Sequence, residues 1–350
     1  MSAEPALRAT VIPAHASPDR GTPQRPSGVR TTDRAPAAAV AVDFYARQTV
    51  NRRRTECIVT GFVLFFLALG LGIDAVWAGF LVPGGEPFPV VTAIALMAAV
   101  AMSLGGYFRG AQMVVASLHA RPLTLADPEH QQLYNIVTEM ALASGLPLPR
   151  IYVIPDLSPN ALSAGRDPQH AILAVTQGLL NLCDREETQG VIAHEMAHIG
   201  NRDTLTMTVV GVLFGGAVML ADWARRALYF RDEGRRGNPL LFVLVVLLIA
   251  VTPLLSRLLA MAVSRQREYL ADATAAQLTR NPLGLARALE KIGMAPSPLE
   301  AATRGTAHFF ISNPWPRRVD ERDGALADLL STHPPLAQRI AILRAMAHAA

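Results

Sequence analysis

The chain alternates between long apolar runs and stretches of mixed polarity. Residues 57–82 are apolar apart from Asp74, and residues 90–107 form a second apolar run after a short turn rich in proline and glycine. A helix of about 17–25 apolar residues crosses a bilayer, so these runs predict a membrane hairpin of two transmembrane helices within residues 43–121. Two further apolar runs follow at 205–221 and 239–262; the first is borderline in length for a span, and Pro253 should kink the second.

Residues 122–205 carry the patterns of a soluble fold. Apolar positions at helical spacing predict a helix over 128–144 that ends at Gly145. Short extended runs bounded by turn residues predict strands at 150–155, 160–165 and 170–178. Helices are also expected in the C-terminal part of the chain, at 282–292, 301–310 and 334–347. The expected fold class is therefore mostly α with a small β-sheet, an α+β domain fused to transmembrane helices.

The stretch with the most specific chemistry is residues 194–198, an H-E-x-x-H pattern. Residues four apart lie on one face of a helix, so His194 and His198 would present two imidazoles to one zinc ion. Glu195 is placed to take a proton from a water at that ion. The neighbouring residues are apolar almost all round, as in a buried helix, and a buried polar cluster is costly unless something satisfies it.

A zinc protease needs a third protein ligand and keeps the fourth position for water. Glu268 is a candidate ligand, and Asp272, one turn further on the same helix face, could orient a ligating histidine through its second ring nitrogen. The alternative is an ordinary solvated helix end. Near the C-terminus, His333 and Arg339 flank a short helix opened by two prolines, which taken alone is an ordinary helix start.

Together, these motifs resemble the membrane-bound zinc endopeptidases of the HtpX and CAAX prenyl protease family. The resemblance runs from about residue 45 to the C-terminus, and its motifs occur in the family's order. It implies a zincin-like metalloprotease domain with one zinc ion per chain, held by His194, His198 and Glu268. It also implies that Glu195 is the catalytic base and that Asp272 orients a ligating histidine through its second ring nitrogen.

The resemblance extends to the substrate side of the site. It places His333 and Arg339 near the substrate, where they would steady the oxyanion; helix capping and packing are the alternative roles. Residues 160–165 match the place of an Asn-Ala-containing edge strand in that family. Asn160 and Ala161 are therefore expected to bind an extended substrate backbone, with an ordinary loop as the alternative.

Composition and charge favour a membrane protein over a nucleic-acid-binding one. The chain is 51% hydrophobic, and its formal net charge of +4 comes from arginines that cluster beside the apolar runs. The only two cysteines, Cys57 and Cys183, form no C-x-x-C, which argues against a cysteine–zinc site and a disulfide framework. Residues 1–42 are rich in Pro, Ala and Arg and are predicted to be a disordered tail.

Arginine placement also predicts orientation. Arginines lie before the first apolar run and after the second, but not in the turn between them. The positive-inside rule then puts both ends of the hairpin, and the catalytic domain, in the cytoplasm, which suits a bacterial inner membrane protein. Several arginines also lie between the third and fourth runs, so it stays open whether those runs cross the bilayer or only enter it.

The predicted function is a membrane-bound zinc endopeptidase that hydrolyses polypeptides, with membrane proteins as substrates in quality control. Its protease domain would span residues 122–350, interrupted by the third and fourth apolar runs. One alternative is a CAAX-type processing protease for lipidated peptides, although such chains have more spans than the four counted here. The other is a non-catalytic zinc-binding membrane scaffold, which would have no need of Glu195.

Overall fold

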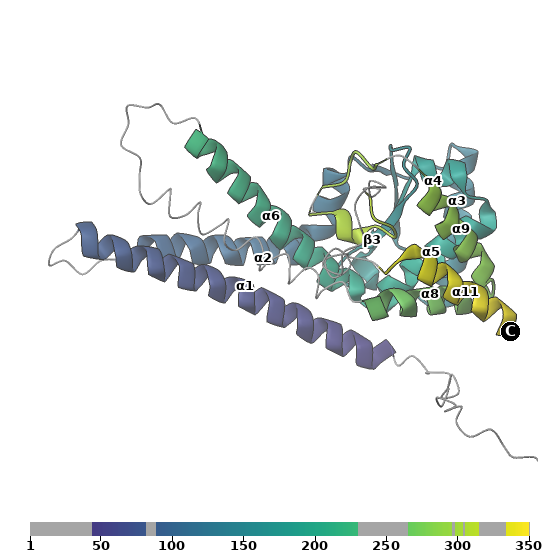
Figure 1. Cartoon of the computed structure of the whole chain (residues 1–350), viewed down its shortest axis with the longest axis horizontal. Helices are drawn as coiled ribbons and strands as arrows, with labels where there is room; N and C mark the ends of the chain where they lie inside the picture. The colour runs from purple at the N-terminus through teal and green to yellow at the C-terminus, as the bar shows by residue number, and fades with distance from the viewer. Residues whose placement is uncertain are drawn as a thin grey trace, which may run out of the picture. The chain divides into compact units, whose positions relative to one another are not determined.

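The computed structural model describes residues 44–81, 89–229, 265–295, 298–303, 305–314 and 334–349. Three features predicted from the sequence lie outside the described residues: the tail at 1–42, the apolar run at 239–262, and His333. Within the described residues, the fold is mostly helical with a small mixed sheet, which confirms the predicted fold class (Figure 1).

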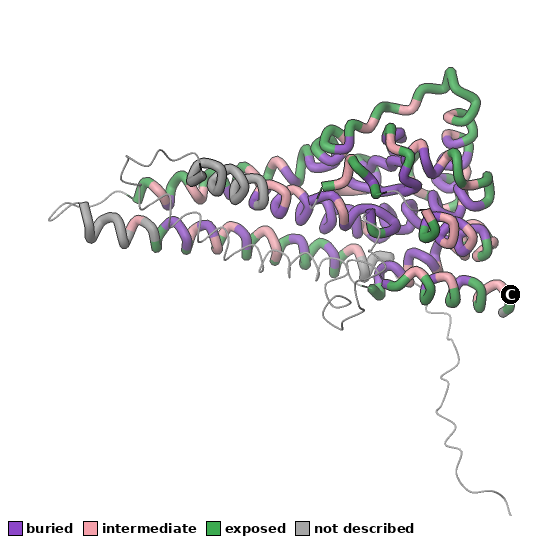
Figure 2. The backbone as a smooth tube through the Cα atoms, turned by 45° about the horizontal axis from the view of Figure 1, so that its top comes forward, coloured by how far each residue is buried: buried purple, intermediate pink, exposed green. Residues whose placement is uncertain are grey.

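Two long apolar helices open the described part of the chain. α1 (Phe44–Leu81) and α2 (Val90–Ser117) pack against each other and against α6 (Asp203–Tyr229). The segments Gln48–Gly72 and Val90–Ser117 are long and apolar enough to cross a membrane. Large apolar residues on both helices are exposed, among them Leu64, Ile94, Met97 and Leu104. Figure 2 shows exposed and intermediate residues recurring along both helices. Exposed apolar surface of this kind is typical of a lipid-facing helix pair.

Asp74, the one charge in the first apolar run, has a structural role at the hairpin. Its carboxylate accepts hydrogen bonds from the backbone N–H groups of Val91 and Thr92, at 3.1 and 2.8 Å, and from the Thr92 hydroxyl at 2.6 Å. These are N–H groups of the first turn of α2, which have no partner within their own helix. Asp74 therefore caps the second helix of the hairpin from the first.

The sheet has four strands in the order β1-β2-β4-β3: β1 (Arg121–Pro122), β2 (Arg150–Ile154), β4 (Ile172–Thr176) and β3 (Ala161–Ala164). β2 and β4 are parallel, whereas the two outer pairings are antiparallel. Every residue of β3 and β4 is buried. The predicted strand at 170–178 is shorter than expected because a 3-10 turn (Pro168–His170) precedes it and the Thr176 side chain caps the next helix.

A layer of helices surrounds α5 (Arg185–Gly200), which carries the H-E-x-x-H pattern. α3 (Pro128–Ser144), α8 (Arg265–Thr279) and α9 (Pro282–Met294) pack on it, and α11 (Leu336–Ala349) packs on α8 and α9; α4 (Gln177–Leu182) leads into α5. A capping box between Asp184 and Glu187 fixes the start of α5. From Gly190 to Gly200, α5 is buried all round, as its apolar flanks predict.

Two local predictions are wrong. Residues 301–310 were expected to be a helix, but only a 3-10 turn (Ala307–Phe309) forms, because Phe310 bridges to Leu162 of β3 and the Ile311 N–H donates to the Ala161 carbonyl. The glycine at position 200, just after the H-E-x-x-H residues, predicts a helix C-cap there by residue type, but the C-cap of α5 is Asn201. The next residue, Arg202, takes the left-handed backbone with φ +57°, so the chain turns sharply into α6.

Candidate metal centre

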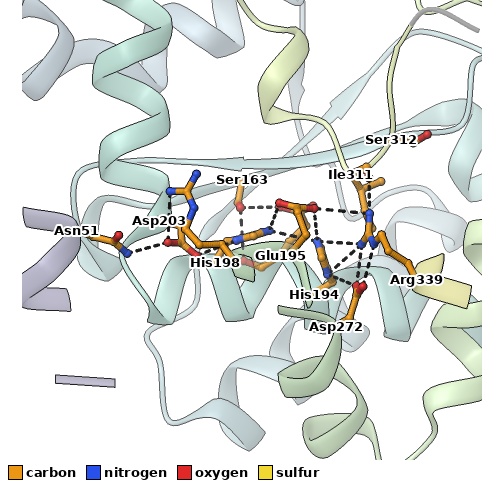
Figure 3. A network of polar contacts seen from close by, with 12 residues as sticks. Asn51, Ser163, His194, Glu195, His198, Asp203, Asp272, Ile311, Ser312 and Arg339 are labelled. Atoms are coloured by element: carbon orange, nitrogen blue, oxygen red, sulfur yellow. Dashed lines mark hydrogen bonds and ion pairs between the residues drawn. The ribbon is translucent and has the colours of Figure 1, made fainter. Parts of the chain in front are cut away.

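α5 brings its two histidines together as their spacing predicts. The Nε2 atoms of His194 and His198 lie 3.2 Å apart, and both side chains are buried (Figure 3). Two nitrogens bound to one tetrahedral zinc ion at about 2.0–2.1 Å would be about 3.3 Å apart. The separation of the two imidazoles is therefore the one that a shared zinc ion requires.

α8 contributes the third candidate ligand. The Glu268 carboxylate places Oε2 at 3.8 Å from Nε2 of His194 and Oε1 at 3.6 Å from Nε2 of His198. Within the residues that the structure describes, these three side chains form a group whose ligand atoms lie within 4.8 Å of one another. His308 is also buried, but its Nε2 lies 3.0 Å from the Met207 carbonyl oxygen.

The second nitrogen of each imidazole meets a carboxylate. Nδ1 of His194 lies 2.9 Å from Asp272 Oδ1, and Nδ1 of His198 lies 3.1 Å from Asp203 Oδ2. An ionised carboxylate can only accept a hydrogen bond, so each Nδ1 carries a proton and each Nε2 is the nitrogen that could bind a metal. The resulting donor set of two imidazoles and a carboxylate suits zinc.

Electrostatics also favour a positive charge here. Burial lowers the pKa of His198, but the hydrogen bond to Asp203 and the negative charges of Glu268, Asp203 and Glu195 outweigh it and raise that pKa to about 9. The negative charge of the carboxylates around the imidazoles thus exceeds the positive charge of the neighbouring side chains. A bound zinc ion would satisfy the same demand.

Arg339 lies at the centre but makes its hydrogen bonds to protein groups. It is fully buried; its Nε and Nη2 donate to Asp272 at 2.8 and 2.7 Å, and its Nη1 donates to the Ile311 carbonyl at 2.9 Å. Burial alone would raise the pKa of Asp272, but Arg339 and His194 hold it down to about 2. The ion pair keeps Asp272 ionised and aimed at His194.

Glu195 is joined to the sheet. The Ser163 hydroxyl donates to Glu195 Oε2 at 2.6 Å, and both side chains are buried. Neither Ser163 nor Asp203 was expected at the site. Asp203 had a weak signal, an acid at the end of the H-E-x-x-H helix, whereas nothing in the sequence around Ser163 links it to Glu195.

The expected substrate-binding residues lie at the sheet edge but are already engaged. The Asn160 side chain donates to the Ser312 carbonyl at 3.1 Å, and the Ala161 carbonyl accepts from the Ile311 N–H at 3.0 Å. Together with the bridge from Leu162 to Phe310, these bonds lay residues 310–312 along the outer edge of β3. A substrate backbone that pairs at Ala161 would have to displace this segment.

Comparison with known proteins gives consistent matches. Residues 127–347 match the model of peptidase family M48. A protease HtpX homolog of Thermoanaerobacter pseudethanolicus is 39% identical over 311 residues, which are 87% of this chain and 98% of the relative. A protease HtpX homolog of Pyrococcus furiosus is 40% identical over 293 residues, 82% of this chain and 95% of the relative. The crystal structure of S. mikatae Ste24p aligns with a TM-score of 0.45 at 18% identity, covering 86% of this chain and 67% of that one.

Proposed function

Because the chain belongs to peptidase family M48 and is a membrane zinc metalloprotease, we propose that it cleaves polypeptides at the cluster on α5 and α8. The observation that carries this assignment is the pair of Nε2 atoms of His194 and His198, 3.2 Å apart with the Glu268 carboxylate beside them. One zinc ion per chain would be held by these three residues. Bound there, zinc would supply Lewis-acid chemistry, polarising the scissile carbonyl and making a water more acidic.

Glu195 moves the proton in this proposal. Its Oε2 accepts the Ser163 hydrogen bond, so we assign the transferred proton to Oε1. Glu195 takes that proton from the attacking water and delivers it to the amine that leaves. Asp272 and Asp203 hold the two imidazoles in the tautomer whose Nε2 is a ligand.

The substrate is proposed to lie along β3. Asn160 and Ala161 would pair with an extended backbone once residues 310–312 leave the strand edge, because a sheet edge binds peptides by strand addition. Arg339 supports the centre through Asp272 and Ile311. A direct role for Arg339 and His333 on the oxyanion stays a prediction.

We further propose that the protein degrades membrane proteins from the cytoplasmic side of a bacterial inner membrane. Two apolar helices long enough to cross a bilayer precede the proposed catalytic domain. Arginines lie before the first apolar run and after the second, which by the positive-inside rule supports a cytoplasmic position of both outer ends. The HtpX homologs align over most of their length, which favours this role over a CAAX-type processing protease. An intact Glu195 favours it over a non-catalytic scaffold.

The experiment is casein cleavage by the full chain purified in detergent, with metal content measured on the same sample. We expect about one zinc per chain, loss of cleavage after chelation, and recovery when zinc is returned. His198→Ala should lose most of the metal. A His198→Ala protein with full zinc, or cleavage that resists removal of all metal, would contradict the proposal.

A further inference from the structure

We propose that the first membrane helix holds the metal centre in place: Asn51 of α1, acting through Asp203, positions the zinc ligand His198. This inference rests on the proposed zinc site. It assigns Asn51 and Asp203 as positioning residues, and it makes α1 a part of the centre as well as a membrane anchor.

A chain of hydrogen bonds connects the helix to the ligand. Asn51 Nδ2 donates to Asp203 Oδ1 at 2.7 Å, and the other oxygen of Asp203 lies 3.1 Å from Nδ1 of His198. All three residues are buried, with at most 5% of their surface exposed. Figure 3 shows Asp203 between Asn51 and His198. Oδ1 of Asp203 thus faces Asn51 of α1, with Nη1 of Arg267 on α8 3.6 Å away, and Oδ2 faces the ligand. Asn51, which hydrogen-bonds Oδ1, therefore helps to fix the rotation of the carboxylate that orients His198.

α1 also fastens the turn on which Asp203 lies. The Asn51 amide donates to the Asn201 carbonyl at 3.0 Å, and the Gln48 amide, one turn earlier, donates to the Gly200 carbonyl at 2.9 Å. These are carbonyls at the C-terminal end of α5, which have no partner within that helix. Asp203 can face His198 because the backbone reverses at Arg202, and α1 binds the chain on both sides of that reversal.

The buried amide of Asn51 is satisfied at the turn that follows α5. It lies at the start of the candidate span Gln48–Gly72, where a buried amide is costly unless it is satisfied. Both of its hydrogen bonds go to the turn beside the H-E-x-x-H helix. A helix that served only as an anchor would be better packed with an apolar residue at this position.

The two histidine ligands are therefore secured from opposite sides of the centre. His194 is oriented by Asp272, which Arg339 of α11 holds, whereas His198 is oriented by Asp203, which Asn51 of α1 holds. Figure 3 shows Asn51 and Arg339 at the two ends of one network, with both ligands between them. A disturbance of α1 should then reach His198 and leave the support of His194 intact.

The test compares variants of the full chain in detergent for the rate at which zinc passes to a chelator. Asn51→Leu keeps the side-chain volume and removes both hydrogen bonds. Asp203→Asn weakens the acceptor itself and should speed zinc loss by about 10–100-fold, the usual cost of removing such a support. Asn51→Leu should speed it several-fold, and the double variant should release zinc no faster than Asp203→Asn alone.

Thr55→Val is the matched control. Thr55 lies one turn further along α1, and its hydroxyl contacts Thr206 at 2.8 Å and donates to the Asn51 backbone carbonyl at 3.0 Å. This variant therefore disturbs the packing of α1 against α6 but leaves the Asn51 amide and Asp203 unchanged. It should release zinc at the wild-type rate. Equal release from Asn51→Leu and wild type, or equally fast release from Thr55→Val and Asn51→Leu, would overturn the inference while leaving the proposed function standing. A wild-type protein without zinc would overturn both.

Discussion

The hydroxyl of Ser163 donates a hydrogen bond of 2.6 Å to Glu195 Oε2, which joins the edge strand of the sheet to the proposed catalytic base. The bond holds Oε2 of the carboxylate in place, and this also sets the direction in which Oε1 points. Because hydrogen bonds to charged groups contribute about 1.5–3 kcal/mol, the loss of this bond should be measurable in the rate.

Ser163→Ala should lower kcat by about 10–100-fold, since about 1.4 kcal/mol corresponds to a tenfold change. KM and zinc content should stay near wild type, because the substitution removes only the hydroxyl that faces Glu195 and leaves the β3 backbone and the three candidate ligands in place. Steady-state kinetics and metal analysis on the same preparation check this. Unchanged kcat would mean that Glu195 needs no support from β3.

Arg339→Met should destabilise the protein strongly. It leaves the buried Asp272 carboxylate without its cationic partner, with only the hydrogen bond from His194, and breaking a buried pair in this way typically costs about 3–5 kcal/mol. Arg344→Ala is the control on the same helix: Arg344 pairs with Glu290 at the surface, where an ion pair contributes at most about 1 kcal/mol. Thermal unfolding in detergent should separate the two variants clearly, and equal stability would contradict the role assigned to the Arg339–Asp272 pair.

Glu268→Gln should lower zinc affinity more than Asp272→Asn does. The first removes the anionic ligand, so zinc affinity and activity should fall together. The second weakens only the support behind His194, for which losses are typically about 10–100-fold. Zinc titration of both variants tests the order. If Glu268→Gln binds zinc as tightly as wild type, the third ligand is a different residue.

The hairpin prediction concerns the side on which α1 begins and α2 ends. Reporter fusions at the N-terminus and after Ala120 should both report the cytoplasm, because arginines flank the two outer ends of the apolar pair. A fusion within the turn at 83–88 is the control and should report the opposite side. Reporters on opposite sides at the two outer positions would exclude a hairpin.

Local patterns predicted the parts of this fold that depend on neighbours in sequence. The helix at Pro128–Ser144 has the predicted bounds, because Asp127 caps its start and Gly145, with φ +67°, ends it. The pairing of His194 with His198 follows from helix periodicity alone. Glu268 was reached through its place in a family motif, since no local rule connects α8 to α5.

Long-range contacts account for what the sequence could not predict. Ser163 contacts Glu195 because the edge strand β3 packs on α5. Asp203 contacts His198 because the chain reverses at Arg202. The predicted helix at 301–310 does not end as expected, because Phe310 pairs with Leu162 of β3, a contact that no local pattern predicts. The role of Asn51 depends on the contact between α1 and the turn at 200–203, which no local pattern predicts.

The most direct test of the account separates metal binding from proton transfer at Glu195. Glu195→Gln keeps the size of the side chain and an acceptor for Ser163, but removes the base. We predict zinc content near one per chain and a fall in cleavage rate of at least about 10²–10⁴-fold, the usual contribution of general-base catalysis. A Glu195→Gln protein that binds zinc and cleaves casein at the wild-type rate would contradict the hydrolytic mechanism proposed here.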